Sequence, residues 1–526
     1  MFTRFGSLSV SQYLLLAWLA LAGSTTAQVK LNGPLPRQVL GAAREFQYTP
    51  SGTSLLYIAD EHADDVFELF SVSVDGSSAP VALSGALVVG GDVADVSGQF
   101  AEVFASAPDG SWVAFLADAT TDGVVELHRA PLDGSAAPTK LSGALVAGGD
   151  VTTFLISADG TTLVFLADAL LDERYELFRA PADGSAAPVR LNSTLVGGGD
   201  VTSFELGLQS ERAYFLADGV LDNVPELFSA PLDASLPAVR LNGALVAGRT
   251  VVDFRVAADE SRVAFRADAS ADELFELFSA PGDGSAASVR LNPTLVAGGD
   301  VTARYKIGAT RVVYIADQDI DGQVELYGAP LDGSAVATKL HPNASWAWDF
   351  TFTPDGALVA FYGMIGSERG IFRVSASGGT PVRLSDALGR DDTIYFLEVS
   401  VDGALCLYER RTTIVDDLLF VVADYSNLHC VSVAGGTPVQ LTQHHLDGYF
   451  ASYPRLTADA SHVTYRREAF YQYGVATDGS GSPVLLAFSF RAESSPDGTR
   501  LAYLDGFLGS MGRLMTVDLD GGGAGD

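Results

Sequence analysis

Cysteine and positive charge are scarce in this 526-residue chain. It has two cysteines, Cys406 and Cys430, and 32 Lys and Arg against 65 Asp and Glu, so its formal net charge at pH 7 is −33. Nucleic acid and anionic membrane surfaces would repel such a chain, which leaves cations, basic proteins and neutral ligands as expected partners. No CxxC pair and no Cys/His spacing of a zinc site occurs. The two cysteines permit either a disulfide or two buried thiols.

Catalytic motifs and helical patterns are missing as well. The chain has no GxSxG elbow, no HExxH and no phosphate-binding Gly loop. After the first 27 residues it shows no helical periodicity and no apolar run that could cross a membrane. These absences favour a non-enzymatic all-β protein without membrane insertion.

The first 27 residues have the features of a secretory signal peptide. Arg4 supplies a positive start, residues 14–21 form an apolar run, and Thr25-Thr26-Ala27 places small residues at a cleavage site. We therefore predict an exported protein, periplasmic or secreted, with its folded domain over residues 28–526.

The remaining sequence is an internal repeat, clearest from Phe165 to Val201. One Asp recurs about every 50 residues, which is the spacing of supersecondary units that bury their faces against one another. It stands at Asp60, Asp118, Asp168, Asp218, Asp268 and Asp317. The pattern of each unit predicts four short strands. In the third unit these are residues 151–157, 162–168, 176–181 and 188–192, and the first and second, like the third and fourth, are separated by Asp-Gly turns typical of hairpins. Four antiparallel strands per unit predict a β-propeller.

The second strand of the unit recurs ten times, from SLLYIAD (54–60) to LAYLDG (501–506), which predicts ten blades. Residues 28–35, QVKLNGPL, copy the fourth strand of later units such as PVRLNSTL (188–195), whereas the last unit stops before its own fourth strand. We therefore expect the N-terminal strand to complete the last blade and close one large ring. Two rings with a boundary near residues 341–346 are the alternative.

The turns carry a family resemblance. TPDGALVAFYG (353–363) and SPDGTRLAYLDG (495–506) resemble blades of TolB-type, WD-repeat-like propellers. The resemblance implies an extracytoplasmic propeller, and it covers nearly all of the chain after the leader. Neither the α/β domain that precedes the TolB propeller nor the hydrolase domain of prolyl peptidases is visible, so it implies no peptidase activity.

An acidic hairpin between the second and third strands of six units has the pattern Asp-x3-Asp-x3-Glu. The first Asp and the Glu are expected nearly opposite one another, so their repulsion requires a neutralising ion or an Arg. The richest copy is DQDIDGQVE, residues 317–325, whose spacing resembles calcium loops of integrin-type propellers and the first half of an EF-hand. Its predicted Ca²⁺ ligands are Asp317, Asp319, Asp321, Glu325 and the carbonyl of Gln323.

The second unit offers a related set of oxygens: Asp118, Thr120, Asp122 and Glu126. Asp side chains that bond to their own hairpin backbone are the alternative interpretation of all these positions. Unit eight instead inserts residues 409–427, a candidate lid or partner-binding loop.

A second acidic set follows Gly-Gly turns in LVxGGDV: Asp92, Asp150, Asp200 and Asp300. Propeller topology places these turns and the acidic hairpins on one face. We therefore predict a binding scaffold that recognises a protein or a glycan through an acidic face, with Ca²⁺ as a possible stabilising ion. The alternative is a propeller lyase or hydrolase with a metal or histidine site near His444 and His445.

Overall fold

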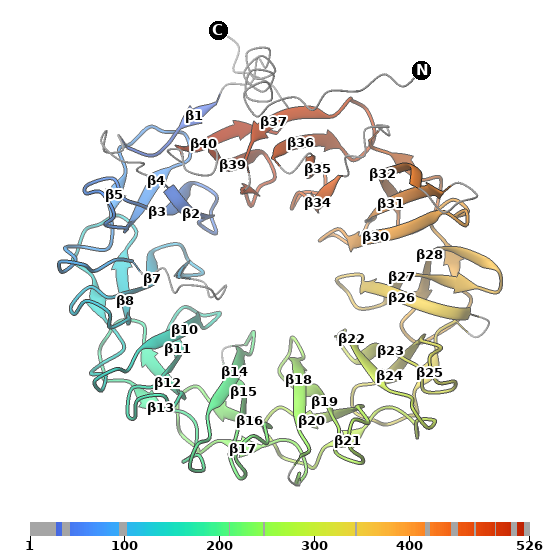
Figure 1. Ribbon diagram of the computed structural model, residues 1–526, viewed down its shortest axis with the longest axis horizontal. Coiled ribbons are helices and arrows are strands. Elements are labelled where there is room, and N and C mark those ends of the chain that lie inside the picture. The colour runs from blue at the N-terminus through green and yellow to red at the C-terminus, as the bar shows by residue number, and fades with distance from the viewer. Residues whose placement is uncertain are drawn as a thin grey trace.

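The chain forms ten four-stranded antiparallel sheets that stand as blades around one common centre (Figure 1). This computed structural model describes residues 28–33, 43–93, 103–209, 211–245, 248–341, 344–415, 421–442, 451–467, 470–489, 491–505 and 513–519. These residues contain strands and turns but no helix, which confirms the predicted all-β propeller. Among them, no helical segment is long and apolar enough for a bilayer.

The first five blades each hold four consecutive strands. Blade 1 has β2 (Ala43–Tyr48), β3 (Ser54–Ala59), β4 (Glu68–Ser73) and β5 (Val81–Ala82). Blade 2 has β6 (Phe104–Ser106), β7 (Trp112–Ala117), β8 (Glu126–Pro131) and β9 (Thr139–Lys140). Blade 3 has β10 (Val151–Ile156), β11 (Thr162–Ala167), β12 (Glu176–Pro181) and β13 (Val189–Arg190). Blade 4 has β14 (Val201–Leu206), β15 (Arg212–Ala217), β16 (Glu226–Pro231) and β17 (Val239–Arg240). Blade 5 has β18 (Val251–Val256), β19 (Arg262–Ala267), β20 (Glu276–Pro281) and β21 (Val289–Arg290).

Blades 6 to 9 follow the same order. Blade 6 has β22 (Val301–Ile307), β23 (Arg311–Ala316), β24 (Glu325–Pro330) and β25 (Thr338–Lys339). Blade 7 has β26 (Ala344–Phe352), β27 (Leu358–Ile365), β28 (Glu368–Ser375) and β29 (Val382–Arg383). Blade 8 has β30 (Asp392–Val399), β31 (Leu405–Val415), β32 (Val421–Ser432) and β33 (Val439–Gln440). Blade 9 has β34 (Ser452–Leu456), β35 (His462–Arg467), β36 (Tyr471–Ala476) and β37 (Val484–Phe488).

Blade 10 joins the two ends of the chain. It contains β38 (Ala492–Ser494), β39 (Arg500–Asp505), β40 (Arg513–Asp518) and the N-terminal β1 (Val29–Lys30), which pairs antiparallel with β40. The first strand of each blade lies nearest the centre and the fourth at the rim (Figure 1). The predicted closure by the N-terminal strand is therefore confirmed.

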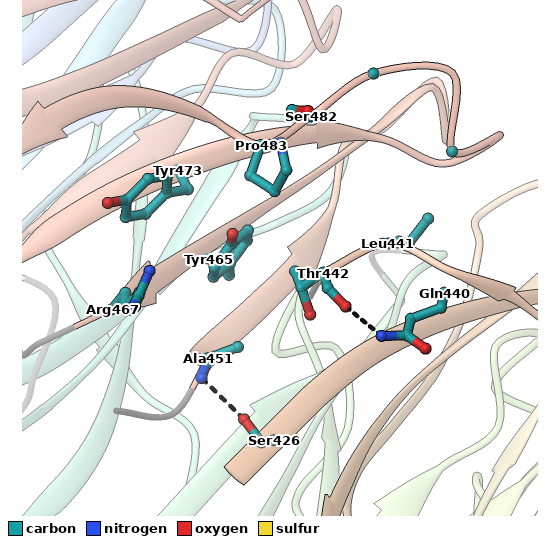
Figure 2. A pocket seen from close by; sticks show the side chains of 12 residues that line it. Ser426, Gln440, Leu441, Thr442, Ala451, Tyr465, Arg467, Tyr473, Ser482 and Pro483 are labelled. Atoms are coloured by element: carbon teal, nitrogen blue, oxygen red, sulfur yellow. Dashed lines mark hydrogen bonds between the residues drawn. The ribbon is translucent and has the colours of Figure 1, made fainter. Parts of the chain in front are cut away.

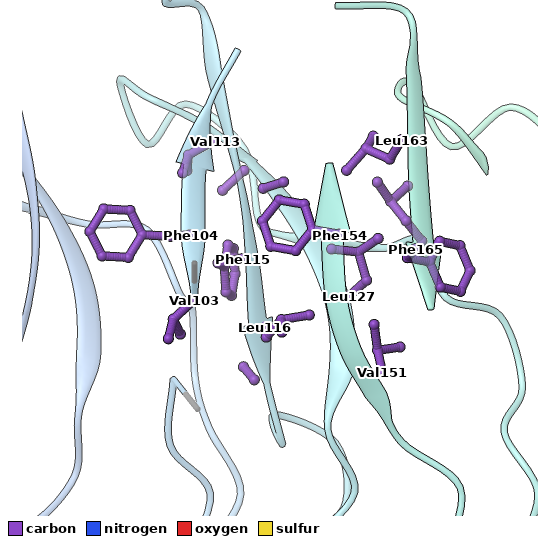
Figure 3. Close-up of a cluster of buried hydrophobic side chains, with 14 of the residues drawn as sticks. Val103, Phe104, Val113, Phe115, Leu116, Leu127, Val151, Phe154, Leu163 and Phe165 are labelled. Carbon is purple, nitrogen blue, oxygen red and sulfur yellow. The ribbon is translucent and has the colours of Figure 1, made fainter. Parts of the chain in front are cut away.

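The core consists of side chains packed between neighbouring blades. One cluster joins blades 1, 2 and 3 and includes Leu56, Phe115 and Phe154, all nearly inaccessible to solvent (Figure 3). Within a blade, an aromatic side chain of the second strand stacks on one of the third, as Phe165 does on Phe178 with ring centroids 5.6 Å apart. The alternation of bulky residues in the second strand thus fills both blade faces, as a sheet buried on both sides requires.

Blade 8 corrects one prediction and settles another. Residues 409–415 and 421–427 extend β31 and β32 as a paired hairpin, with Glu409 opposite Leu428, so they are not a separate lid loop. Cys406 is opposite Val431 and Cys430 is opposite Leu407, which points the two thiols to opposite faces of the sheet. Both cysteines are buried and free, so this pair is two thiols and not a disulfide.

Candidate functional site

In blades 2, 3 and 6 the first Asp of the acidic hairpin accepts hydrogen bonds from two loops. In blade 3, the Asp168 carboxylate accepts hydrogen bonds from the backbone N–H of Asp150 at 2.6 Å and of Glu173 at 3.0 Å. Asp118 in blade 2 accepts in the same way from Asp92 and Gly123. These carboxylates therefore hold their own hairpin and the connection from the preceding blade in place.

In blades 2 to 6 the Glu of the acidic hairpin is buried and is neutralised by a base from the fourth strand of its own blade. Glu176 lies 2.8 Å from Arg190, and the same arrangement occurs in four other blades. These pairs are Glu126–Lys140, Glu226–Arg240, Glu276–Arg290 and Glu325–Lys339. The strand register explains this contact. Arg190 is opposite Phe178 on β12, and Glu176, two residues before Phe178, lies on the same face of the sheet as its diagonal neighbour. The neutralising group predicted from the repeated carboxylates is thus a Lys or Arg in these five blades.

Blade 1 departs from this arrangement. Ala82 occupies the position of the base, opposite Phe70, and Glu68 instead lies 2.7 Å from the imidazole of His62. Because His62 is an exposed residue of the hairpin itself, the pairing in blade 1 is local and depends on the protonation of a histidine.

The sixth hairpin contains the five predicted calcium ligands, and three of their side chains, Asp317, Asp319 and Glu325, have protein partners. Asp317 accepts from the N–H groups of Asp300 and Gly322 at 2.6 and 2.9 Å. The Lys339 ammonium lies 2.9 Å from Asp319 and 2.7 Å from Glu325. Ca²⁺ would therefore have to replace Lys339 before it could use these carboxylates. In the described part of the chain, no three His, Cys, Asp or Glu side chains gather in a group that could hold a metal.

A Lys339→Met variant tests calcium binding here. It frees Asp319 and Glu325, so we expect Ca²⁺ to raise the melting temperature of this variant more than that of the wild-type protein. An ion at about 100 times its Kd adds about 2.7 kcal/mol of stability. Differential scanning calorimetry with CaCl₂ and with EDTA measures the shift, and Lys140→Met makes the same comparison for Asp118, Thr120, Asp122 and Glu126. If each protein has the same melting temperature with CaCl₂ and with EDTA, these hairpins do not bind calcium.

The second acidic set joins neighbouring blades. Asp150, in the connection from blade 2 to blade 3, accepts a 2.7 Å hydrogen bond from the N–H of Val125 in blade 2, while its own N–H donates to Asp168 of blade 3. Asp92, Asp200 and Asp300 accept equally from Phe67, Tyr175 and Phe275. Burial raises the pKa of Asp150, and the N–H of Val125 opposes that shift. These aspartates connect the blades to one another.

The junction of blades 4 and 5 shows why the Asp is needed. Here Pro225 takes the place of Val125 and has no N–H to donate, and Thr250 takes the place of Asp150. The other bonds remain: Val251 N–H donates to the Pro225 carbonyl and Thr250 N–H to Asp268. At this junction donor and carboxylate are therefore both absent. At the junction of blades 6 and 7, where Ala347 N–H donates to the Val324 carbonyl, the carboxylate is also replaced, by Trp346, although Val324 has an N–H.

The Gly-Gly of the same motif makes room for the hairpin of the following blade. A Cβ on Gly149 would lie 2.8 Å from the Asp168 carbonyl, and one on Gly148, whose φ is +85°, would lie 2.8 Å from the Asp172 carboxylate. Larger residues would push the connection off the hairpin. The conserved spacing of both acidic sets within the repeat therefore has a structural cause.

The middle Asp of each hairpin is the group that remains at the surface. In the described residues these side chains are exposed and form no ion pair, and in blades 1, 3 and 5 the residue after them, Asp65, Glu173 or Glu273, is also acidic and exposed. They are Asp64, Asp122, Asp172, Asp222, Asp272 and Asp321. The loop between the second and third strands opens at the same end of every blade, so the six hairpins that carry these residues lie on one face of the ring over six consecutive blades.

Two glutamates outside this face, the buried Glu409 and the half-buried Glu493, have strongly shifted pKa values. Burial raises the pKa of Glu409 on β31 to about 7, against opposing effects of the Ser426 hydroxyl and Arg411. Burial likewise raises the pKa of Glu493 on β38 to about 7. The histidines predicted as an alternative site, His444 and His445, lie outside the described residues.

Glu409 predicts a pH-dependent stability. Its pKa in the folded protein exceeds the ordinary value of 4.5. Its contribution to the free energy of unfolding is therefore fully present below about pH 4.5 and is lost as the pH rises to 7. We expect Glu409→Gln to raise the free energy of unfolding by on the order of 2 kcal/mol at pH 8 and to leave it unchanged at pH 4. Urea unfolding at both pH values measures this. The exposed Glu211→Gln is the control, and an equal effect of Glu409→Gln at both pH values would contradict the prediction.

The chain has structural neighbours but no sequence relative among the proteins compared. No protein-family model and no curated protein sequence matches it. Oligogalacturonate lyase from Vibrio parahaemolyticus aligns with 12% identity over 70% of this chain and 98% of its own, with a TM-score of 0.37. Dipeptidyl peptidase 4 from Porphyromonas gingivalis gives 11% identity, 77% and 67% coverage and a TM-score of 0.44. The putative TolB from Agrobacterium tumefaciens aligns with 15% identity over 48% of this chain and 81% of its own, with a TM-score of 0.27. At these identities the likeness concerns the propeller fold alone.

Proposed function

We propose that this chain is a non-enzymatic binding propeller that holds a basic segment of another protein on its acidic hairpin face. The observation that carries the proposal is the set of six exposed aspartates, one per blade, from Asp64 to Asp321. Their inner neighbours, the first Asp and the Glu, are committed to hydrogen bonds and ion pairs. The exposed set is available to a partner, and a chain of net charge −33 attracts a cationic one at long range.

The blades also support binding over catalysis. Six consecutive hairpins have nearly the same length and acidic pattern, and a reaction centre requires one arrangement of groups that differs from its copies. A glycan is the second kind of ligand predicted for this face, but it lacks the positive charge that would use these carboxylates. A lyase or hydrolase site at His444 and His445 remains the alternative prediction.

Two matched sets of substitutions test the proposal. Asn in place of the six hairpin aspartates removes six negative charges from one face. Asn at Asp75, Asp133, Asp183, Asp233, Asp283 and Asp332 removes six from the opposite face, where these exposed residues accept the N–H of the residue two positions later. The probe is a fluorescent oligolysine peptide, measured by anisotropy over a range of NaCl concentrations.

We expect the hairpin set to weaken oligolysine binding at least about ten-fold and to flatten its salt dependence, because the lost contacts are ion pairs. The opposite set should change affinity by less than about two-fold. Equal losses from both sets would mean that net charge alone attracts the peptide, which would overturn a site on the hairpin face.

The proposal includes export and a distant relation to TolB-type propellers. Export rests on the leader over residues 1–27, and mass spectrometry of the purified natural protein, with an N-terminus at Gln28, would support it. The relation to TolB-type blades rests on the Asp-Gly turns, such as Thr353 to Gly356, where Asp355 accepts from the Thr353 hydroxyl and the Ala357 N–H. Calcium belongs to the proposal only as a stabiliser of the sixth and second hairpins.

A further inference from the structure

The junction of blades 8 and 9 contains a cavity of about 620 Å³ that no step of the proposed function uses (Figure 2). A groove also runs along the junction of blades 3 and 4, where the fourth strand of blade 3 meets the turn between the third and fourth strands of blade 4. That groove is lined only by residues 189–193 and 234–238. The cavity at blades 8 and 9 extends further inward, to Ser426, Tyr465 and Tyr473.

The backbone hydrogen bonds establish which positions correspond. Leu428 N–H donates to Thr442 as Leu177 N–H donates to Asn192. Ala451 N–H donates to the Ser426 hydroxyl, where Val201 N–H donates to the Tyr175 carbonyl. On β35 and β36, Tyr465 is opposite Tyr473, as Phe215 is opposite Phe228 in blade 4. The two junctions can therefore be compared residue by residue.

The comparison shows two kinds of change: three side chains become smaller and three become more polar. The replacements are Ser426 for Tyr175, Ala451 for Val201, Thr442 for Asn192, Tyr465 for Phe215, Tyr473 for Phe228 and Arg467 for Ala217. The first three shorten side chains and open the space. The last three add two phenol hydroxyls and a guanidinium to its lining. A void left by loss of packing alone would be apolar, so the added polar groups indicate a ligand.

The lining identifies the class of ligand. Five hydroxyl side chains line the space: Ser426, Thr442, Tyr465, Tyr473 and Ser482. A hydroxyl has one donor and two acceptor positions, of which Ser426 and Thr442 use one acceptor position each for the N–H groups of Ala451 and Leu428. Figure 2 shows these side chains around one space, with Arg467 on one side and Gln440 on the other. The two tyrosine rings, stacked with centroids 5.5 Å apart, add flat apolar surface. Sugars combine hydroxyl groups with apolar C–H faces, so they match such a lining.

We propose that the cavity between blades 8 and 9 binds a mono- or disaccharide. Its volume lies within the range of about 300–1,000 Å³ that small-molecule sites occupy. The site is separate from the acidic hairpin face, so it does not depend on the function proposed above. Gln440 closes one wall, since its amide donates 2.7 Å to the Thr442 carbonyl and leaves its oxygen for a sugar hydroxyl.

Saturation-transfer NMR on the full chain tests the site, with glucose, galactose, mannose, N-acetylglucosamine, cellobiose, lactose and chitobiose as probes. We expect saturable binding of at least one of them, with Kd then measured by calorimetry. Ser482→Trp at the exposed edge of the cavity should weaken that sugar at least about ten-fold, because the indole occupies its space. Gln440→Ala should weaken it about three-fold through loss of one hydrogen bond.

The control is Pro237→Trp, which places the same indole at the corresponding turn position of blade 4. Both residues are exposed, so circular dichroism and the melting temperature should stay unchanged in both variants. Wild-type affinity in Pro237→Trp together with the loss in Ser482→Trp supports the site. No saturable signal from any probe, or equal affinity in both Trp variants, overturns it.

Discussion

A Leu31→Ala substitution is expected to lower the free energy of unfolding by about 2–4 kcal/mol, although Leu31 follows a strand of only two residues near the N-terminus. Leu31 is 4% exposed and belongs to a cluster that contains residues of blade 10, such as Leu514, and of blade 1, such as Tyr57. Its N–H donates 2.8 Å to the Leu514 carbonyl. The truncation thus leaves a cavity at the place where the ring closes. Urea unfolding followed by tryptophan fluorescence measures the effect.

Leu191→Ala is the matched control, because Leu191 has the same place in blade 3, is 5% exposed and donates to Leu177 as Leu31 does to Leu514. If Leu31→Ala and Leu191→Ala lower the free energy of unfolding by similar amounts, the closing strand is as firmly packed as an internal one. The exposed Lys30→Ala should cost less than about 0.5 kcal/mol. A negligible effect of Leu31→Ala beside a large effect of Leu191→Ala would mean that the ring holds without its closing strand.

Removal of residues 28–33 should have a larger consequence. It leaves β40 as an unpaired edge, and unpaired edges associate with other strands. We expect the shortened chain to form oligomers in size-exclusion chromatography with light scattering. A synthetic QVKLNG peptide should bind the shortened chain and restore the monomer, whereas a peptide with Asp for Leu should not.

The features that the sequence predicts well are those repeated in every unit. The alternating bulky residues of the second strand recur ten times and Asp-Gly turns occur in most units, so the number of blades, their strand order and the closure by residues 28–35 follow from pattern alone. The neutralising partner of each hairpin Glu was predicted only as an ion or an Arg. The fourth strand that supplies Arg190 has two residues, which is too short to reveal its register.

The cavity at blades 8 and 9 is a feature that sequence reasoning missed. Ser426 and Ala451 are ordinary strand residues when each is considered alone. Only an alignment of unit eight with unit three shows that they replace Tyr175 and Val201 at one junction. The long hairpin of β31 and β32 was mistaken for a loop because its polar residues hide the strand alternation, and pairing across the hairpin is visible only in three dimensions.

The hydrogen bond between the Val125 N–H and Asp150, which joins blades 2 and 3, gives a further large expected effect. Asp150→Thr should lower the free energy of unfolding by about 2 kcal/mol, because it removes a 2.7 Å hydrogen bond to a charged acceptor and leaves the Val125 N–H without a partner. Val125→Pro alone should also destabilise, since it leaves the Asp150 carboxylate without its donor. Asp150→Asn, which keeps an acceptor oxygen, should cost less than Asp150→Thr.

The double variant Val125→Pro/Asp150→Thr reproduces the pair that blades 4 and 5 use naturally, Pro225 and Thr250. It removes donor and acceptor together, so neither polar group remains unsatisfied. We expect its destabilisation to be smaller than the sum of the two single effects by about 1–2 kcal/mol, as measured in a double-mutant cycle by urea unfolding. Strict additivity would show that Asp150 acts independently of the Val125 N–H. Such a coupling would explain why Pro225 and Thr250 occur together at the junction of blades 4 and 5.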